Sequence, residues 1–142
     1  MAAQRYAVPS PAAVAGILLD SDVIIDALRG RLRTLAEIRA VEQEGIATYC
    51  CTVSWAEIFA GLRAGEEPTA EAFFQARHDV VLDAVIGRRA GQYLFRYAKS
   101  HGLKIADALV GAAASTTGLR LWTVNRRHYP MEDVRFYEPS GF

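Results

Sequence analysis

Apolar positions along the chain follow two patterns, short continuous runs that suit strands and longer helical repeats between them. The first run, residues 16–19, is apolar throughout, which is typical of a strand buried on both faces of a sheet. Further strands are predicted at 46–53, 119–124 and 134–137. Strands that alternate with helices indicate βαβ units around a mainly parallel sheet, so the predicted fold class is α/β.

Apolar residues spaced three and four positions apart predict amphipathic helices between these strands. One helix is predicted at 32–45 and another at 55–65, and each ends at a glycine. Thr69 is expected to cap the helix that follows, and Asp83 to begin a longer helix that ends at Gly102.

The chain is predicted to form one domain, since 142 residues are enough for a single substantial core. Residues 1–13 are predicted to be a flexible leader and residues 14–142 the domain. The longest apolar run, 12–19, is too short to span a bilayer and lacks the flanking features of a secretory signal.

The two cysteines, Cys50 and Cys51, are adjacent in a predicted strand, where alternation disfavours a mutual disulfide. A cytoplasmic protein without a membrane partner is therefore expected.

Polar side chains are predicted to gather where the strands end. In parallel sheets, ligands bind beyond the carboxyl ends of the strands, where the strand-to-helix turns converge. Two polar residues directly follow predicted strands, and two lie in the first turns of the helices predicted at 55–65 and 106–115. These residues are Asp20, Asn125, Glu57 and Asp107. We expect the four side chains to meet at one edge of the sheet.

Each of these positions also has a purely structural interpretation. Ser54 and Glu57 have the S-x-x-E spacing of a capping box, and Asp107 suits the N-cap of an apolar helix. Asp20 or Asp22 can cap the helix that follows them. These structural roles do not by themselves explain why all the polar positions fall at the same end of the sheet.

The clustered carboxylates predict a metal site. Carboxylates brought together raise one another's pKa unless a cation lies between them. An open cluster of oxygen ligands suits Mg²⁺ or Mn²⁺, whereas neither the cysteines nor the three histidines have the spacing of zinc ligands. The predicted ligands are Asp20, Glu57 and Asp107.

Four blocks occur in order along the chain: "ILLDSDVIIDALRG", "TVSWAEIFAGL", "IADALVGAAA" and "LRLWTVNRRHYP". They resemble the signature blocks of PIN-domain ribonucleases, specifically the VapC toxins of VapBC toxin–antitoxin pairs, over residues 17–137. The resemblance implies a Rossmann-like α/β/α sandwich with a central, mainly parallel sheet. It also implies a metal-dependent endoribonuclease, usually dimeric, that is neutralised by a VapB-type antitoxin.

The resemblance assigns roles to individual residues. It makes Asp20 and Asp107 ligands of a Mg²⁺ or Mn²⁺ ion, and Glu57 either a ligand of a second ion or the residue that orients the attacking water. Asn125 falls at the fourth, acidic position, although related toxins often carry Asn there. Its neutral amide favours a single ion, or a second ion that arrives with RNA. Cleavage is expected to leave a 5′-phosphate and a 3′-hydroxyl.

Residues beside these positions have supporting roles. Ser21 and Thr123 can orient the ligands through hydrogen bonds, or can simply pack in the sheet. Asp22 either joins the metal network or caps the first helix, and the cap is the favoured interpretation.

The net charge is balanced, with sixteen basic and sixteen acidic residues, so it neither favours nor excludes a nucleic-acid partner. One basic cluster, Arg126, Arg127 and His128, directly follows a predicted strand. It is either a solvated turn or a contact for the RNA backbone at the mouth of the site.

The resemblance also indicates the partners, which are an RNA substrate, the antitoxin and a second copy of the chain. Apolar residues around Trp55 and Phe73 are candidates for the antitoxin's groove, although such residues are more commonly core. Which RNA is cut depends on surface shape, which the motifs do not encode.

Two other functions stay open at the level of sequence. Asp20 and Asp22 match the D-x-D-x-[TV] motif of haloacid-dehalogenase-type phosphatases, with Lys99 or Lys104 as the later lysine, but the expected acidic pair is absent after 119–124. That function requires a covalent aspartyl-phosphate. The other alternative is a degenerate PIN domain that binds RNA or antitoxin without cleaving RNA.

Overall fold

The computed structural model describes residues 16–140, so the leader predicted at 1–13 lies outside the described residues. Within this range four strands form one sheet in the spatial order β3-β2-β1-β4, and every neighbouring pair is parallel. The strands are β1 (Ile17–Leu19), β2 (Thr48–Cys51), β3 (His78–Val80) and β4 (Arg120–Trp122). The predicted parallel sheet is confirmed, and β1 lies between β2 and β4.

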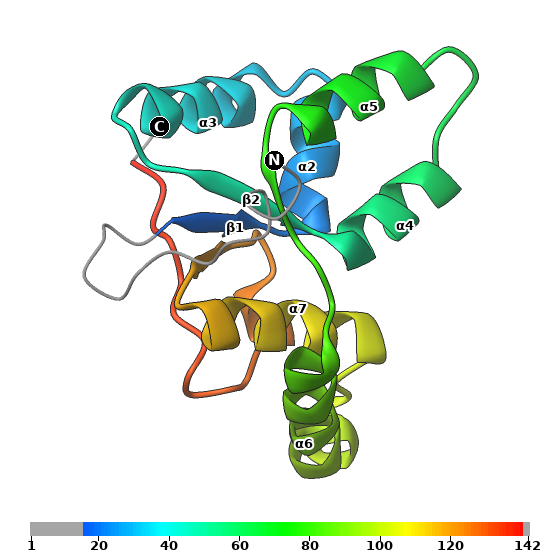
Figure 1. Cartoon of the computed structure of the whole chain (residues 1–142), viewed down its shortest axis with the longest axis vertical. Coiled ribbons are helices and arrows are strands. Elements are labelled where there is room, and N and C mark those ends of the chain that lie inside the picture. Colours follow the sequence, from blue (N-terminus) through cyan, green and yellow to red (C-terminus); the bar gives the residue numbers. More distant parts are fainter. Residues whose placement is uncertain (1–15, 141–142) are drawn as a thin grey trace.

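Helices cover both faces of the sheet and make a three-layer sandwich (Figure 1). One face is covered by α6 and α7, and the other by α2, α3, α4 and α5. The helices are α2 (Ser21–Leu28), α3 (Leu32–Gln43), α4 (Thr52–Ala60), α5 (Glu67–Gln75), α6 (Ala84–His101), α7 (Ile105–Thr117) and the short 3-10 helix η1 (Arg126–His128). The α/β/α sandwich implied by the resemblance is confirmed.

Side chains of the strands alternate between two hydrophobic cores, one on each face of the sheet. Leu18 and Cys51 belong to the core beneath α6 and α7, whereas Leu19 and Cys50 belong to the core on the other face. Both cysteines are buried and free. The prediction that adjacent strand positions keep these two thiols apart is confirmed.

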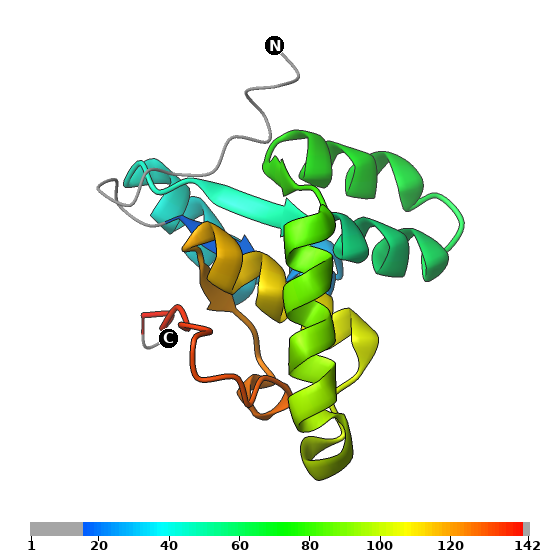
Figure 2. The same cartoon turned by 60° about the horizontal axis from the view of Figure 1, so that its bottom comes forward.

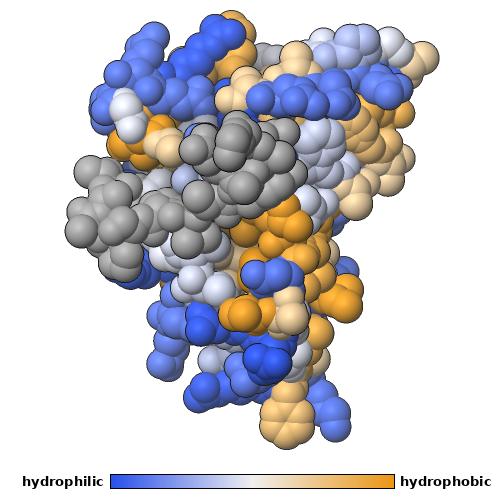
Figure 3. Space-filling model, in the orientation of Figure 1, coloured by the Kyte–Doolittle hydropathy of each residue, from blue (hydrophilic) through white to orange (hydrophobic). Residues whose placement is uncertain are grey.

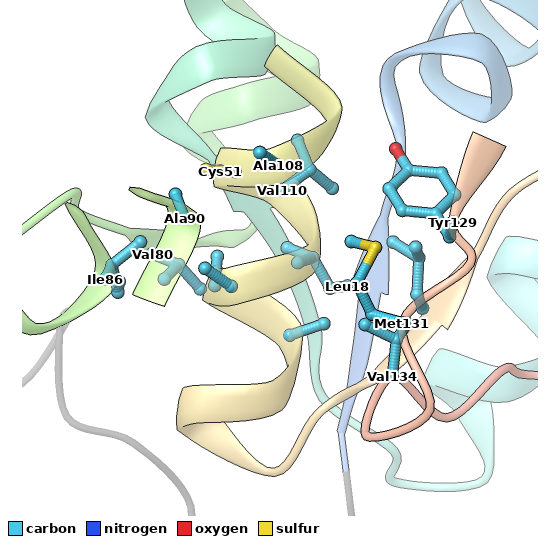
Figure 4. Packing of buried hydrophobic residues seen from close by; sticks show 14 of the residues in the cluster. Leu18, Cys51, Val80, Ile86, Ala90, Ala108, Val110, Tyr129, Met131 and Val134 are labelled. Atoms are coloured by element: carbon cyan, nitrogen blue, oxygen red, sulfur yellow. The ribbon is translucent and has the colours of Figure 1, made fainter. Parts of the chain in front are cut away.

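Small residues allow α7 to lie close to the sheet. Ala108 and Ala112 are fully buried, and a Cβ atom added at Gly111 would collide with the Met131 side chain. Figure 4 shows α7 passing directly between residues of the sheet and residues of α6. This packing brings the first turn of α7 to the edge where β1 ends.

The strand predictions differ from the structure at two places. β3 was not predicted, because its three residues are too few to show a period. The segment 134–137 is not a strand; it makes one isolated bridge, between Phe136 and Leu121. Two backbone hydrogen bonds join this segment to β4. The Leu121 N–H donates to the Arg135 carbonyl, and the Tyr137 N–H donates to the Leu121 carbonyl.

The predicted helix ends are partly confirmed. Asp83 caps α6, since its carboxylate accepts a hydrogen bond from the Ile86 N–H at 2.9 Å. Gly102 ends α6 in the left-handed conformation, with φ of 65°. The predicted cap at Thr69 is wrong, because α5 already begins at Glu67 with a proline in its first turn.

The surface seen in Figure 3 mixes hydrophilic and apolar side chains, and apolar side chains gather over the segment that joins β3 to α6. Val81 and Val85, at the two ends of this stretch, are exposed by 42% and 51%. Of the helices within residues 16–140, none combines the length and the apolar character needed to cross a membrane.

Candidate active site

Asp20 lies between the last residue of β1 and the first residue of α2. Its backbone N–H donates to the Trp122 carbonyl at 2.9 Å, which extends the pairing of β1 with β4. Its carboxylate Oδ1 accepts a hydrogen bond from the Ser21 N–H at 2.8 Å, so Asp20 is the N-cap of α2. The cap predicted at this position is confirmed, and the same buried carboxylate faces the carboxyl edge of the sheet.

Tyr129 joins Asp20 to Asp107. Its hydroxyl donates to Asp20 Oδ2 at 2.7 Å and lies 3.4 Å from Asp107 Oδ1. The ring is buried in the core beneath α7, and Figure 4 shows the hydroxyl pointing toward the end of β1. Sequence reasoning missed this residue; the available signal was a tyrosine shortly after Asn125 in the fourth block.

Ser21 links α2 to α4. Its hydroxyl donates to Glu57 Oε1 at 2.6 Å and lies 2.8 Å from the Ser54 hydroxyl. The predicted capping box is wrong, because α4 begins at Thr52 directly after β2 and Ser54 is therefore inside the helix. Ser54 and Glu57 share the face of α4 that is turned toward Ser21.

Asp22 does not cap the helix; it binds the turn after β4 instead. Asp22 Oδ2 accepts hydrogen bonds from the Thr123 hydroxyl at 3.1 Å, the Val124 N–H at 3.2 Å and the Asn125 side-chain amide at 3.1 Å. The cap interpretation fails because Asp20 already holds that position. Asn125 is thus placed beside Asp22 at the carboxyl edge, at the end of β4 where it was expected.

Asp107 lies in the first turn of α7. The predicted N-cap is wrong, because α7 begins at Ile105 and its N-cap is Lys104. The carboxylate faces a histidine: His128 Nδ1 lies 3.7 Å from Asp107 Oδ2. η1 therefore sits directly beside Asp107.

The arginines of η1 face different surroundings. Arg126 makes an ion pair with Glu138 at 2.6 Å and also donates to the Tyr137 carbonyl. Arg127 is exposed and borders two hollows, one beside Asn125 and one beside Asp107. Arg126 thus supports the C-terminal segment, whereas Arg127 stands at the mouth of the site.

Comparison with known proteins places this arrangement in a family. The family model of the PIN domain matches residues 17–134. This chain belongs to the PIN-domain family. Ribonuclease VapC10 of Mycobacterium tuberculosis is 34% identical over 116 residues, which cover 81% of this chain and 86% of that protein. Ribonuclease VapC19 of the same organism is 31% identical over 115 residues, covering 80% and 92%.

A solved structure shares the fold of this PIN domain. The DNA-bound VapBC complex from Salmonella typhimurium contains a chain that matches with a TM-score of 0.74 and 16% identity, covering 87% of this chain and 98% of that one. Because the chain belongs to the PIN-domain family, the phosphatase alternative is discarded. That alternative rested on the spacing of Asp20 and Asp22.

Burial and mutual repulsion raise the pKa values of the PIN domain's carboxylates. Burial raises the pKa of Asp20 and of Asp107, and the negative charges of Asp107 and Glu57 respectively add to these shifts. Burial likewise raises the pKa of Asp22, and the charge of Asp20 contributes next. The negative charges of these carboxylates therefore disfavour one another's ionised forms.

The donor set fits a hard divalent cation. Among residues 16–140, no three His, Cys, Asp or Glu side chains lie close enough together to hold a metal ion as they stand. Oδ1 of Asp22 is nevertheless buried without a hydrogen-bond partner in that part of the chain, so an oxygen ligand is available. Burial raises the pKa of the nearby Cys51 thiol to about 11, which keeps it protonated and disfavours a thiolate ligand.

Proposed function

We propose that this PIN domain is the toxin of a toxin–antitoxin pair and an endoribonuclease that depends on Mg²⁺ or Mn²⁺. The observation that carries the proposal is the contact of Tyr129 with both Asp20 and Asp107, which brings together a carboxylate from the end of β1 and one from the first turn of α7. The ribonuclease names of the two curated relatives support RNA as the substrate.

The residues divide the chemistry between them. Asp20 and Asp107 would hold the ion, and Tyr129 fixes Asp20 by its hydrogen bond. A bound ion would supply Lewis-acid chemistry, polarising a phosphodiester oxygen and lowering the pKa of a water molecule. Glu57, held by the Ser21 hydroxyl, orients the attacking water for in-line displacement. The products carry a 5′-phosphate and a 3′-hydroxyl.

The turn after β4 supports this arrangement from the other side. Thr123 and Asn125 both donate to Asp22, so the neutral amide of Asn125 is used to fix a neighbouring carboxylate. An amide at this position leaves the site less negative than a fourth carboxylate would. We therefore propose a single resident ion, with any second ion arriving together with RNA.

The antitoxin is proposed to cover a hollow beside Glu57. Phe73 is buried and the half-buried Trp55 ring stacks on the buried Phe74, so we propose another surface for the antitoxin. A hollow of about 240 Å³ instead lies among α2, α4 and α5, with Leu28 among its apolar lining, and it reaches Glu57. The structural neighbour from Salmonella typhimurium is a VapBC complex, which supports a VapB-type partner. The homodimer stays a prediction.

The proposed activity is tested by incubating total RNA with the purified chain in Mg²⁺, in Mn²⁺ and in EDTA, and mapping the new ends by sequencing. Metal-dependent cuts at defined sites are expected, and Asp20→Asn is expected to abolish them. Asp26→Asn is the matched control, since Asp26 lies on the same helix and pairs only weakly with Arg31 at 3.6 Å. RNA left intact by the unsubstituted chain with both metals would favour the degenerate, binding-only PIN domain.

A further inference from the structure

A small hollow opens beside Asp107. It has a volume of about 110 Å³ and lies where the end of α6, the start of α7 and η1 meet. Figure 2 shows η1, in orange, beside the lower end of α6. Four basic side chains line it: His101, Lys104, Arg127 and His128. Three separate elements of the fold thus contribute positive or protonatable groups to one place.

The charges around this hollow are unequal. Lys104 and Arg127 are basic residues of the lining, and Asp107 is the single acidic residue in it. Asp107 already faces His128 at 3.7 Å, and the charges of His128 and Lys104 both lower its pKa against the effect of burial. The hollow therefore has excess positive charge and suits an anion.

The size of the hollow restricts that anion to a small group. Pockets for whole small-molecule ligands have volumes of about 300 Å³ or more. At about 110 Å³ the hollow is well below that size. Its volume therefore suits a small anionic group, such as a phosphate, better than a whole nucleotide.

We propose that this hollow is a subsite for a backbone phosphate of the RNA, one that lies next to the scissile phosphate. The subsite rests on the proposed function, because it requires a strand of RNA running past Asp107. Arg127 borders both this hollow and the one beside Asn125, so the RNA backbone passes it on the way across the site. Lys104, at the start of α7, is a second basic residue that can contact this phosphate.

The subsite distinguishes Arg127 from its neighbour. Arg126 is held by Glu138 at 2.6 Å and by the Tyr137 carbonyl, and it does not line the hollow at Asp107. From the sequence, Lys104 is a candidate only for a phosphatase, and His101 is one of the three histidines without zinc-ligand spacing. The subsite therefore adds residues that no sequence block contains.

The test measures binding of a single-stranded RNA oligonucleotide in EDTA, where cleavage is blocked, at several salt concentrations. Arg127→Gln and Lys104→Gln are each expected to weaken binding about tenfold at low salt and to reduce the slope of log K against log salt by about 0.7 to 1. Arg39→Gln, an exposed arginine on α3, is the matched control and is expected to match the unsubstituted chain. Unchanged thermal unfolding midpoints in all three variants show that the chain still folds.

The outcomes separate the subsite from the proposed function. The unsubstituted chain can bind and cut RNA while Arg127→Gln and Lys104→Gln bind it with the same dependence on salt. That result would overturn the subsite and leave the proposed function standing. No RNA binding by the unsubstituted chain would overturn the subsite and the proposed function together. Inorganic phosphate is the second probe: if it displaces RNA at micromolar concentration, the hollow is a free-phosphate site and the RNA subsite is overturned.

Discussion

The Tyr129 hydroxyl donates a 2.7 Å hydrogen bond to Asp20, a residue that lies at the opposite end of the described chain. The contact crosses from the segment after η1 to the end of β1, and both side chains are buried. The same hydroxyl lies 3.4 Å from Asp107. A single aromatic residue therefore sets the relative positions of the two carboxylates proposed to hold the metal.

Tyr129→Phe removes this donor and keeps the ring. Because groups that hydrogen-bond a ligand also fix its orientation, Mn²⁺ binding is expected to weaken by about 10-fold to 100-fold. Isothermal titration of the RNA-free chain with Mn²⁺ measures this change. Tyr49→Phe, another buried tyrosine at the start of β2, is the control and is expected to bind Mn²⁺ as before. Equal affinity in the two variants would contradict the role given to the Tyr129 hydroxyl.

Ser21→Ala removes the hydroxyl that donates to Glu57 at 2.6 Å. Glu57 then loses its fixed position while keeping its charge, so kcat for RNA cleavage is expected to fall about tenfold with little change in KM. Steady-state cleavage of a mapped substrate in Mn²⁺ measures both constants. Thr34 on α3 supplies the control, Thr34→Ala. A variant that loses only affinity for RNA would argue against orientation by Ser21.

Asp22→Ala leaves three donors at the end of β4 without their acceptor. The Thr123 hydroxyl, the Val124 N–H and the Asn125 amide all point to Asp22 Oδ2, so the free energy of unfolding is expected to fall by about 2 to 3 kcal/mol. Urea unfolding at neutral pH measures the loss. Asp26→Ala, on the next turn of α2, is expected to cost under about 1 kcal/mol. Similar losses in the two variants would show that the turn does not depend on Asp22.

Glu37 on α3 ties down the C-terminal segment. Its carboxylate accepts hydrogen bonds from the Tyr137 hydroxyl, the Ser140 N–H at 3.2 Å and the Ser140 hydroxyl at 2.8 Å. Burial alone would raise the pKa of Glu37, but these hydrogen bonds outweigh it and lower the pKa below its usual value of 4.5. The folded state therefore binds this proton less readily than the unfolded state does.

The stability that Glu37 contributes is present above about pH 4.5 and is lost as the pH falls through the lower pKa of the folded state. Glu37→Gln is expected to reduce the free energy of unfolding at pH 7 and to flatten its fall between pH 5 and 3. Urea unfolding across this range checks the expectation. Glu67→Gln, exposed at the start of α5, is the control. If the free energy of unfolding falls equally between pH 5 and 3 in Glu37→Gln and in the unsubstituted chain, groups other than Glu37 cause the fall.

The layered α/β architecture could be predicted from the sequence because it depends on local periods. Apolar runs mark β1 and β4, and helical spacing marks the helices that cover them. The parallel sheet then follows from the alternation of strands and helices. β3 and the single bridge at Phe136 could not be predicted, because a three-residue strand and an isolated pairing are determined by neighbours far away in the chain.

The sequence by itself determined that Asp20 lies at the carboxyl edge, because a residue that directly follows a parallel strand is placed there by the strand. Only the tertiary structure decided how the carboxylates of the site are held. Asp22 binds Asn125 rather than capping α2, and Tyr129 reaches Asp20 from the far end of the chain. The physical reason is that hydrogen bonds between segments distant in sequence leave no period or spacing in the sequence; they exist only once the packed core has brought the two segments together.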